Sequence, residues 1–122
     1  MWIENRREIN TYEEVMNFIK NNNEFHDMRI GSLDYDSTEK TAKIFIEEVD
    51  SSKKVSENDV LYQYYFELKE VEKFIFHSDL ALTTYVLGTY EDDNKDITLA
   101  LTNGEITFNA KQIILSVPDE QK

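Results

Sequence analysis

Two histidines are the side chains best suited to chemistry in this sequence, because each lies close to an aspartate. His26 directly precedes Asp27, and His77 lies two residues before Asp79. If two strands brought these groups together, the imidazoles and carboxylates could bind a divalent metal. Neighbouring residues point to opposite faces of a strand, however, so His26 and Asp27 could not both be ligands in regular β-structure. We expect hydrogen-bonded His-Asp pairs at strand ends or turns, and a metal site at His26, His77 and Asp79 is the less favoured alternative.

A run of acidic residues offers a second candidate site. The spacing of Asp92, Asn94 and Asp96 resembles the start of a calcium-binding loop. Ile97 occupies the position where that loop needs glycine, and Asn103 stands where it needs a bidentate glutamate. The sequence therefore predicts a solvated turn between two strands. Its four carboxylates could contact a basic partner: Glu91, Asp92, Asp93 and Asp96.

The sequence contains no recognisable catalytic motif. It has no cysteine and no Gly-x-Ser-x-Gly elbow, and three glycines are too few for a phosphate-binding loop. Carboxylate pairs arise by chance among 25 acidic residues, so they do not identify a general acid and base. We expect no enzymatic activity and no cofactor.

Three tyrosines in one predicted strand are candidates for binding. Tyr62 and Tyr64 lie on the same face as Phe66 and Leu68, whereas Tyr65 points to the opposite face. Tyrosine is common in interfaces because it combines a large apolar area with a polar tip. Ordinary packing on both faces of the strand is the alternative. Because the three cannot all reach one core, we take Tyr62, Tyr64 and Tyr65 as a candidate interface.

Charge is the most unusual property of the composition. The 122 residues include 13 lysines and arginines against 25 aspartates and glutamates, which gives a net charge of −12. Such a surface repels phosphate, so direct nucleic-acid binding is not expected. It would instead attract a basic protein partner, such as a toxin or a nuclease. The alternative is that the acidity only keeps the protein in solution.

The length fits a single domain, residues 1–122, with one core. No apolar run approaches the ~18 residues that a membrane span needs, and the first residues lack the features of a signal peptide. The absence of cysteine fits a reducing compartment. We therefore expect a cytoplasmic protein with no membrane partner, either a monomer or a homodimer.

One helix is predicted within residues 10–23, after an N-terminal segment of residues 1–9 that holds apolar residues at positions 2, 3 and 9. Thr11 and Glu14 form a capping-box pattern, and apolar residues follow at helical spacing from residue 12 to about residue 21. Asparagines 21–23 favour a helix end, since asparagine tolerates the left-handed conformation. A helix this short, with one apolar stripe, should cover one face or end of a sheet.

Residues 24–117 show the period-two alternation of β-strands. In the first strand, Ile30 and Leu33 should point to opposite faces. The Asn103-Gly104 pair lies between alternating apolar residues and predicts a hairpin in which both residues have positive φ. The other strands are expected at residues 41–48, 60–68, 71–77, 82–90, 97–102, 105–109 and 111–117, with a short connection at 69–70 and a polar tail at 118–122.

These elements predict an α+β protein that is mainly β. There is no alternation of strand and helix that would indicate a parallel sheet, and the turns are short. We expect one N-terminal helix packed on an antiparallel meander of about seven strands. The sheet could be rolled, folded into a sandwich, or closed into a partly open barrel.

Several short motifs resemble a group of small bacterial β-rich proteins with an "FHDSxI…SIxYD" opening. The matching stretches are residues 25–30 and 33–36, a Phe66–Phe74 segment like the group's "F-x-x-V-x-x-F", and residues 103–111. Met28 stands where the group usually has serine. Some of these proteins are similar to immunity proteins that neutralise toxins of competing bacteria. The resemblance implies a β-rich fold and an inhibitory binding role, and it carries over no catalytic residues.

Three hypotheses of function follow. The favoured one is a non-enzymatic acidic protein that covers a basic protein partner, as an immunity protein does. The second is a mimic of nucleic acid, in which rows of carboxylates block the channel of a nuclease. The third is a β-barrel that binds a metal or small ligand through His26 and His77.

Overall fold

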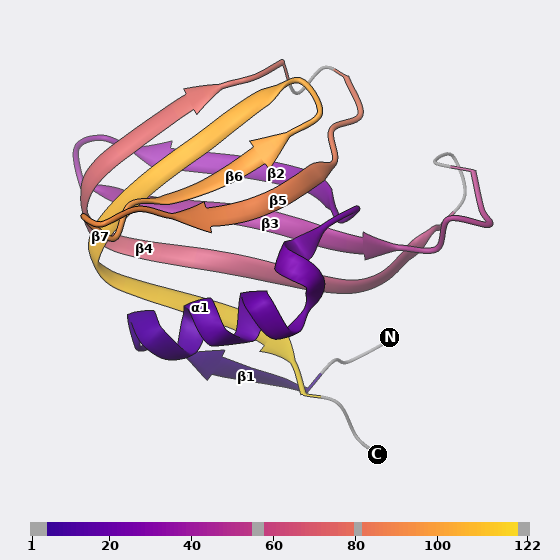
Figure 1. Ribbon diagram of the computed structural model, residues 1–122, viewed down its shortest axis with the longest axis horizontal. Coiled ribbons are helices and arrows are strands. Elements are labelled where there is room, and N and C mark those ends of the chain that lie inside the picture. Colours follow the sequence, from indigo (N-terminus) through magenta and orange to yellow (C-terminus); the bar gives the residue numbers. More distant parts are fainter. Residues whose placement is uncertain (1–4, 55–57, 80–81, 120–122) are drawn as a thin grey trace.

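The protein is one rolled antiparallel sheet with a single α-helix at its open side (Figure 1). The computed structural model describes residues 5–54, 58–79 and 82–119. Its helical elements are α1 (Tyr12–Asn21) and a short 3₁₀ turn, η1 (Asn23–Phe25). Its strands are β1 (Arg6–Ile9), β2 (Arg29–Asp36), β3 (Thr41–Val49), β4 (Val60–His77), β5 (Val86–Glu91), β6 (Ile97–Leu101) and β7 (Gly104–Pro118). The prediction of one helix and about seven antiparallel strands is confirmed.

Helix α1 forms where the capping pattern predicts it. The backbone N–H of Glu14 donates to the Thr11 hydroxyl at 3.2 Å, and that hydroxyl donates to the Glu14 carboxylate at 2.8 Å. This satisfies one of the N–H groups that every helix start leaves without a partner. Val15, Met16 and Ile19 form the buried stripe, so the helix contributes its apolar side to the core of the sheet.

The strand order is β2-β3-β4-β7-β6-β5, and β1 pairs with β7. Strands β2 to β4 form one meander and β5 to β7 another, so the expected continuous meander is interrupted between β4 and β5. The chain leaves β4, builds β5 and β6 farther out, and returns to β4 only with β7. The sheet stays open, although an isolated antiparallel bridge between Arg29 and Tyr85 links β2 to the start of β5.

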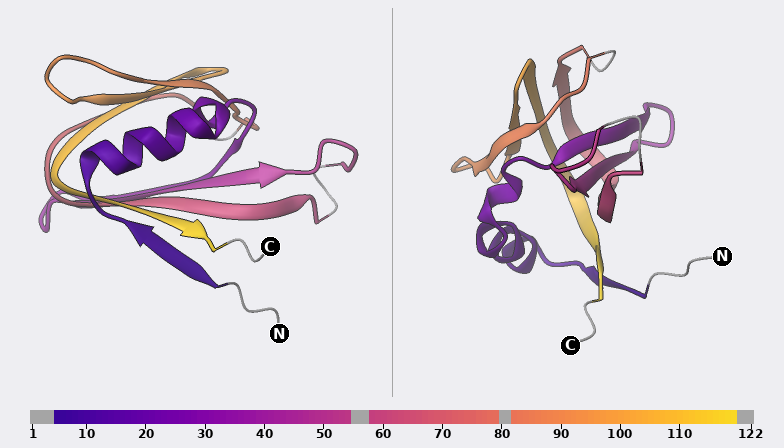
Figure 2. Two further views of the ribbon diagram at one scale, coloured as in Figure 1. Left: turned by 60° about the horizontal axis from the view of Figure 1, so that its bottom comes forward. Right: turned by 90° about the vertical axis from the view of Figure 1, so that its right-hand side faces the viewer.

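Strands β4 and β7 are each longer than predicted, and both bend. Residues 60–68 and 71–77 are one strand, because the expected connection at 69–70 is an irregularity within it, with Glu70 at a φ of 52°. Residues 105–109 and 111–117 likewise belong to one strand. Both strands curve through the sheet and therefore take part in two layers (Figures 1 and 2). The alternation of inward and outward residues skips one residue here. The skip marks a bulge within a continuous strand, whereas the sequence predicted a break.

A bulge also changes the facing of β2. The register with β3 shifts between Ile30 and Ser32, so that Ile30 pairs with Ile46 and Leu33 pairs with Ile44. Ile30 and Leu33 therefore both face the core, which corrects the expectation of opposite faces. Gly31 is the extra residue, and a side chain on it would lie 3.1 Å from the Glu47 side chain.

The two ends of the described chain lie beside each other in one strand pair. Strand β1 lies in the N-terminal segment, where no strand was predicted. It pairs with β7 from Arg6 opposite Pro118 to Ile9 opposite Leu115. Pro118 is buried in β7 and the N–H of Asp119 donates to the Asn5 carbonyl at 2.7 Å. The predicted polar tail therefore does not begin at residue 118. Residues 2 and 3, two of the apolar residues of the N-terminal segment, lie outside the described ranges.

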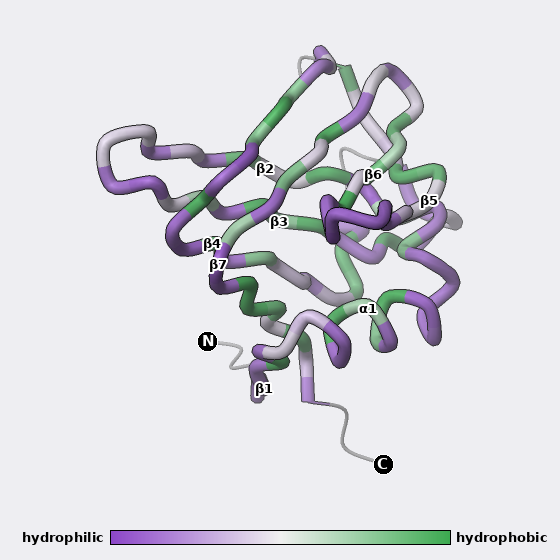
Figure 3. Tube along the Cα trace, turned by 60° about the vertical axis from the view of Figure 1, so that its left-hand side comes forward, coloured by the Kyte–Doolittle hydropathy of each residue, from purple (hydrophilic) through white to green (hydrophobic). Residues whose placement is uncertain are grey.

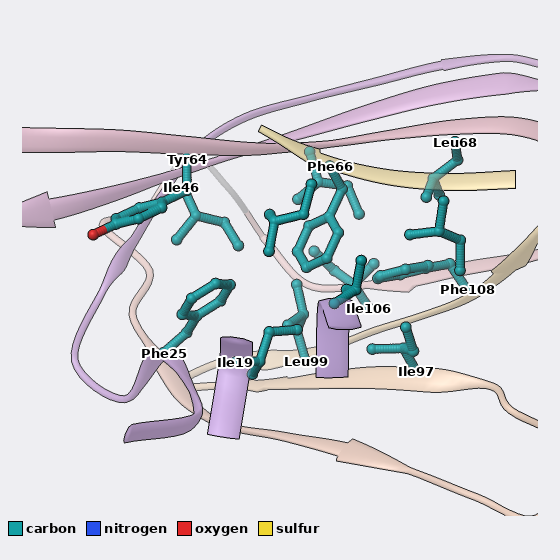
Figure 4. Packing of buried hydrophobic residues seen from close by; sticks show 14 of the residues in the cluster. Ile19, Phe25, Ile46, Tyr64, Phe66, Leu68, Ile97, Leu99, Ile106 and Phe108 are labelled. Carbon is teal, nitrogen blue, oxygen red and sulfur yellow. The ribbon is translucent and has the colours of Figure 1, made fainter. Parts of the chain in front are cut away.

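The core fills the space between the two layers and the helix (Figure 4). Three buried phenylalanines lie at its centre: the ring of Phe66 is 6.3 Å from that of Phe25 and 5.2 Å from that of Phe108. The strands show the alternation of apolar and hydrophilic residues that a sheet with one buried face requires (Figure 3). Helix α1 lies at the opening between the layers, where its apolar stripe covers the core (Figure 2).

The hairpin between β6 and β7 forms, but its turn is one residue earlier than predicted. Leu101 pairs with Gly104, so Thr102 and Asn103 are the turn residues, and neither has a positive φ. Gly104 itself has a φ of 154°, and a Cβ there would lie 1.7 Å from the carbonyl oxygen of His77. Glycine is needed because β4 approaches the start of β7 closely, rather than for the turn. Strand β5 also begins later than predicted, at Val86.

Substitution of Gly104 tests this close approach. We expect Gly104→Ala to lower the free energy of unfolding by on the order of 3 kcal/mol, because the methyl group meets backbone that cannot move independently. Gly88→Ala is the matched control, since its Cβ would lie 2.9 Å from the hydroxyl of the exposed Tyr90 side chain, which can turn away. Urea unfolding of the three proteins measures the difference. Equal losses in the two variants would contradict this explanation.

Candidate binding surface

An aromatic pair on the outer face of the sheet is the most organised surface feature. Phe45 of β3 and Tyr65 of β4 are cross-strand partners whose ring centroids are 5.2 Å apart. The guanidinium of Arg6 lies 5.1 Å from the Tyr65 ring, and the Lys43 ammonium lies 5.7 Å from it. We call these four residues the outer aromatic patch. Tyr65 is therefore on the face away from the core, as the sequence predicts.

Arg6 is held in place by the strands beneath it. Its Nε donates to the Ser116 hydroxyl at 2.8 Å, and its Nη2 donates to the Gln63 carbonyl at 2.6 Å. Partial burial lowers the pKa of the guanidinium. These two hydrogen bonds fix the guanidinium over the Tyr65 ring. The outer aromatic patch is therefore ordered before any partner binds.

The other two tyrosines of the candidate interface occupy different environments. Tyr64 is only 5% exposed, its ring lies 5.6 Å from that of Phe25, and it belongs to the core. Its hydroxyl reaches the edge of the core and donates to the Glu48 carboxylate at 3.1 Å. Only the hydroxyl of Tyr64 is therefore placed near the surface, and its ring belongs to the core. Tyr62 faces the same way but lies beyond the core, with 37% of its surface exposed.

The acidic turn between β5 and β6 is largely engaged within the protein. Asp92 accepts hydrogen bonds from the N–H groups of Asn94 and Asp96, which shapes the turn. Glu91 pairs with Lys20 of α1 at 3.3 Å. Asp93 is exposed in the middle of the turn. Of the four carboxylates proposed to contact a partner, Glu91, Asp92 and Asp93 are thus at exposed positions, and Asp93 lies outside the contacts just described.

Asp96 is a structural carboxylate rather than an accessible one. Its side chain is buried, accepts a hydrogen bond from Lys73 of β4 at 2.5 Å, and accepts another from the Asn109 amide of β7 at 2.8 Å. The hydrogen bond from Lys73 and then that from Asn109 lower the pKa of Asp96. The hydrogen bond with Asp96 raises the pKa of Lys73 in turn. Asp96 therefore links the start of β6 to two other strands, in a place where its carboxylate is engaged within the protein.

Tyr12 joins the start of helix α1 to the same turn. Its hydroxyl is buried and makes no hydrogen bond to the described residues, and the Lys95 ammonium lies 5.3 Å from its ring centroid. Burial, with the nearby charges of Glu91 and Asp92, raises the pKa of Tyr12 to about 12. Its phenol therefore stays neutral at physiological pH.

The two histidines have structural surroundings. Nδ1 of His26 lies 2.8 Å from the Leu87 carbonyl, and its Nε2 lies 3.4 Å from the Asp27 carboxylate. His77 pairs with Glu105 at the end of the β4–β7 ladder. Among the described residues, no group of three or more histidines, aspartates and glutamates is placed to hold a metal ion. The structure therefore gives no support to a metal site at His26, His77 and Asp79.

An ion-pair network that the sequence analysis missed joins β2 to the loop before β4. Arg29 donates to Asp59 through both terminal nitrogens, at 2.7 and 3.0 Å, and through Nε to Glu47 at 3.0 Å. The Arg29 hydrogen bonds lower the pKa of Asp59, and the bond to Asp59 raises the pKa of Arg29. From the sequence, only the pair formed by Arg29 and Glu47 could have been predicted, because these two residues lie opposite each other on β2 and β3.

Comparison with protein-family models, with curated proteins and with solved structures finds no match to this chain. In the part of the chain that the structure describes, no helix is long and apolar enough to cross a membrane.

Acid should weaken the contact between Asp96 and Lys73. A carboxyl group whose pKa is lowered by folding stabilises the protein above its ordinary pKa of 3.8 and loses that contribution as the pH falls through the lower, folded value. We expect Asp96→Asn to reduce the free energy of unfolding at pH 7 and to flatten its decline below about pH 4. Urea titrations across pH 2–7 measure both effects, with Asp93→Asn as the control. The same pH profile in all three proteins would refute this role.

Proposed function

We propose that this chain is a non-enzymatic binding protein that inhibits a basic protein partner, such as a toxin or nuclease, by covering its surface. The supporting observation is the number of acidic side chains that the fold leaves at the surface. In ion pairs between described residues, lysine and arginine neutralise Glu47, Asp59, Glu91 and Asp96. Most other described carboxylates lie at exposed positions, and the net charge is −12.

The outer aromatic patch is suited to the centre of such an interface. Phe45 and Tyr65 are half-buried and packed on each other, and the cations of Arg6 and Lys43 lie over the Tyr65 ring. Interfaces commonly place an ordered aromatic group at the centre and polar groups at the rim. Acidic groups would accelerate the encounter with a basic partner, and the patch would supply apolar contact once the partner is bound.

The outer face of β2, β3 and β4 gives less support to the alternative hypothesis, in which the protein mimics nucleic acid. The strand register places Lys43 between Asp34 and Glu67 across β2, β3 and β4. A cation in that position interrupts what would otherwise be a row of carboxylates, whereas a nucleic-acid mimic needs consecutive negative charges. Displacement of the partner by DNA or RNA would restore this alternative.

A pull-down from the organism that encodes the chain tests the proposal. The immobilised protein should retain a basic protein at about 50 mM salt and lose it at about 1 M, because the screening length falls to about 3 Å. The matched control bait replaces five exposed glutamates with glutamine, at positions 13, 24, 70, 72 and 105. It should retain less of the same protein. Capture that depends on neither salt nor these charges would contradict the proposal.

A further inference from the structure

Two strand edges in the rolled sheet have no neighbouring strand along part of their length. Strand β2 is the last in the sheet order, and its residues 31–36 form a ladder only with β3. Residues 73–77 of β4 form a ladder only with β7, because β3 has already ended opposite Lys69. These statements hold within the ranges that the structure describes. Both edges therefore present backbone groups that another strand could pair with.

The two edges lie near each other, because hydrogen bonds join them at both ends. At one end, the Val71 N–H donates to the Lys40 carbonyl at 2.9 Å, across the turn that follows β2. At the other end, the Ile30 N–H donates to the Thr84 carbonyl at 2.9 Å. The hydroxyls of Thr84 and Ser78 both donate to Asn103, which connects that point to the end of β4. Between these points the edges of β2 and β4 run near each other.

Aromatic side chains that remain partly exposed lie at these two edges. Tyr35 of β2 stacks on Phe74 of β4, with ring centroids 4.9 Å apart and planes 6° from parallel. Tyr35 is 45% exposed, and Phe76, the next inward residue of β4, is 38% exposed. Exposed aromatic groups beside an unpaired strand edge offer apolar contact to the side chains of an added strand.

Acidic side chains determine which strand could add here. Along β2, Leu33 and Tyr35 face inward, while Asp34 and Asp36 face outward and are exposed. A second copy of the chain pairing through β2 would bring these aspartates close to their own counterparts, which is unfavourable. An extended segment with basic residues facing outward and apolar residues facing inward would complement both faces of β2. Asp34 and Asp36 also protect the edge from pairing with acidic or neutral strands.

We propose that the β2 edge is the docking site for an extended segment of the basic partner, which adds to the sheet as an antiparallel strand beside residues 31–36. This inference rests on the proposed function and names the surface and the chemistry of the partner. Main-chain hydrogen bonds to β2 hold the segment in register, and its alternating apolar and basic side chains contact Tyr35 and Asp34. The outer aromatic patch then contacts the body of the partner.

A synthetic peptide tests the docking site without the natural partner. The probe is an acetylated peptide of roughly ten residues that alternates lysine with valine, and the comparison peptide carries N-methyl groups on alternate residues. Both have the same charges and nearly the same side chains, but the second cannot form the complete set of main-chain bonds. We expect the unmodified peptide to bind, to protect the amides of residues 31–36 from hydrogen exchange, and to bind at least about tenfold more tightly than the methylated one.

Two charge reversals complete the test. Asp34→Lys should weaken peptide binding by about tenfold or more, whereas Glu8→Lys makes the same change in charge on the exposed surface of β1 and should change it little. Circular dichroism confirms that both variants are folded. Equal effects of the two reversals, equal affinity of the two peptides, or protection elsewhere in the sheet would overturn the β2 site. The pull-down result would still stand, because it depends only on total charge and not on where the partner binds.

Discussion

The ladder between β4 and β7 is the interaction on which the rest of the structure depends. It runs from Tyr65 opposite Ser116 to His77 opposite Glu105 and bends with both strands. Because one continuous ladder belongs to both layers, neither side of the core between them can form without the other. Strands β2 and β3 attach to one side of it, β5 and β6 to the other, and α1 covers the space that the bend leaves open.

The same bend separates the surfaces that are available for binding. The outer aromatic patch lies on the first half of β4, where β3 supplies Phe45 as a cross-strand neighbour. Beyond the irregularity at Glu70, β4 leaves β3 and its edge becomes free. One strand thus carries a flat, ordered surface on one half and an unpaired edge on the other. Charged groups near the bend, such as Lys73 with Asp96, link neighbouring strands of the sheet.

Local signals in the sequence were more reliable than signals that depend on distant neighbours, although the turn predicted at Asn103-Gly104 lies one residue earlier. The Thr11–Glu14 cap and the limits of α1 depend on residues a few positions apart, and both were predicted correctly. The continuity of β4 and the facing of Leu33 depend on bulges, which a period-two pattern interprets as breaks or reversals. The burial of Asp96 could not be predicted, because Lys73 and Asn109 reach it only through the strand order.

The pairing of β1 with β7 has a consequence for how the chain acquires its fold. Ile9 lies opposite Leu115, and Tyr65 lies opposite Ser116, so the contacts at the centre of the sheet join parts of the chain that are far apart in sequence. Closing such long loops costs entropy before any contact compensates for it, which makes folding slow compared with that of a helical domain. During synthesis on the ribosome, the β2–β3 hairpin can form early. Strand β1 cannot pair, and the core between the layers cannot be completed, until β7 has emerged.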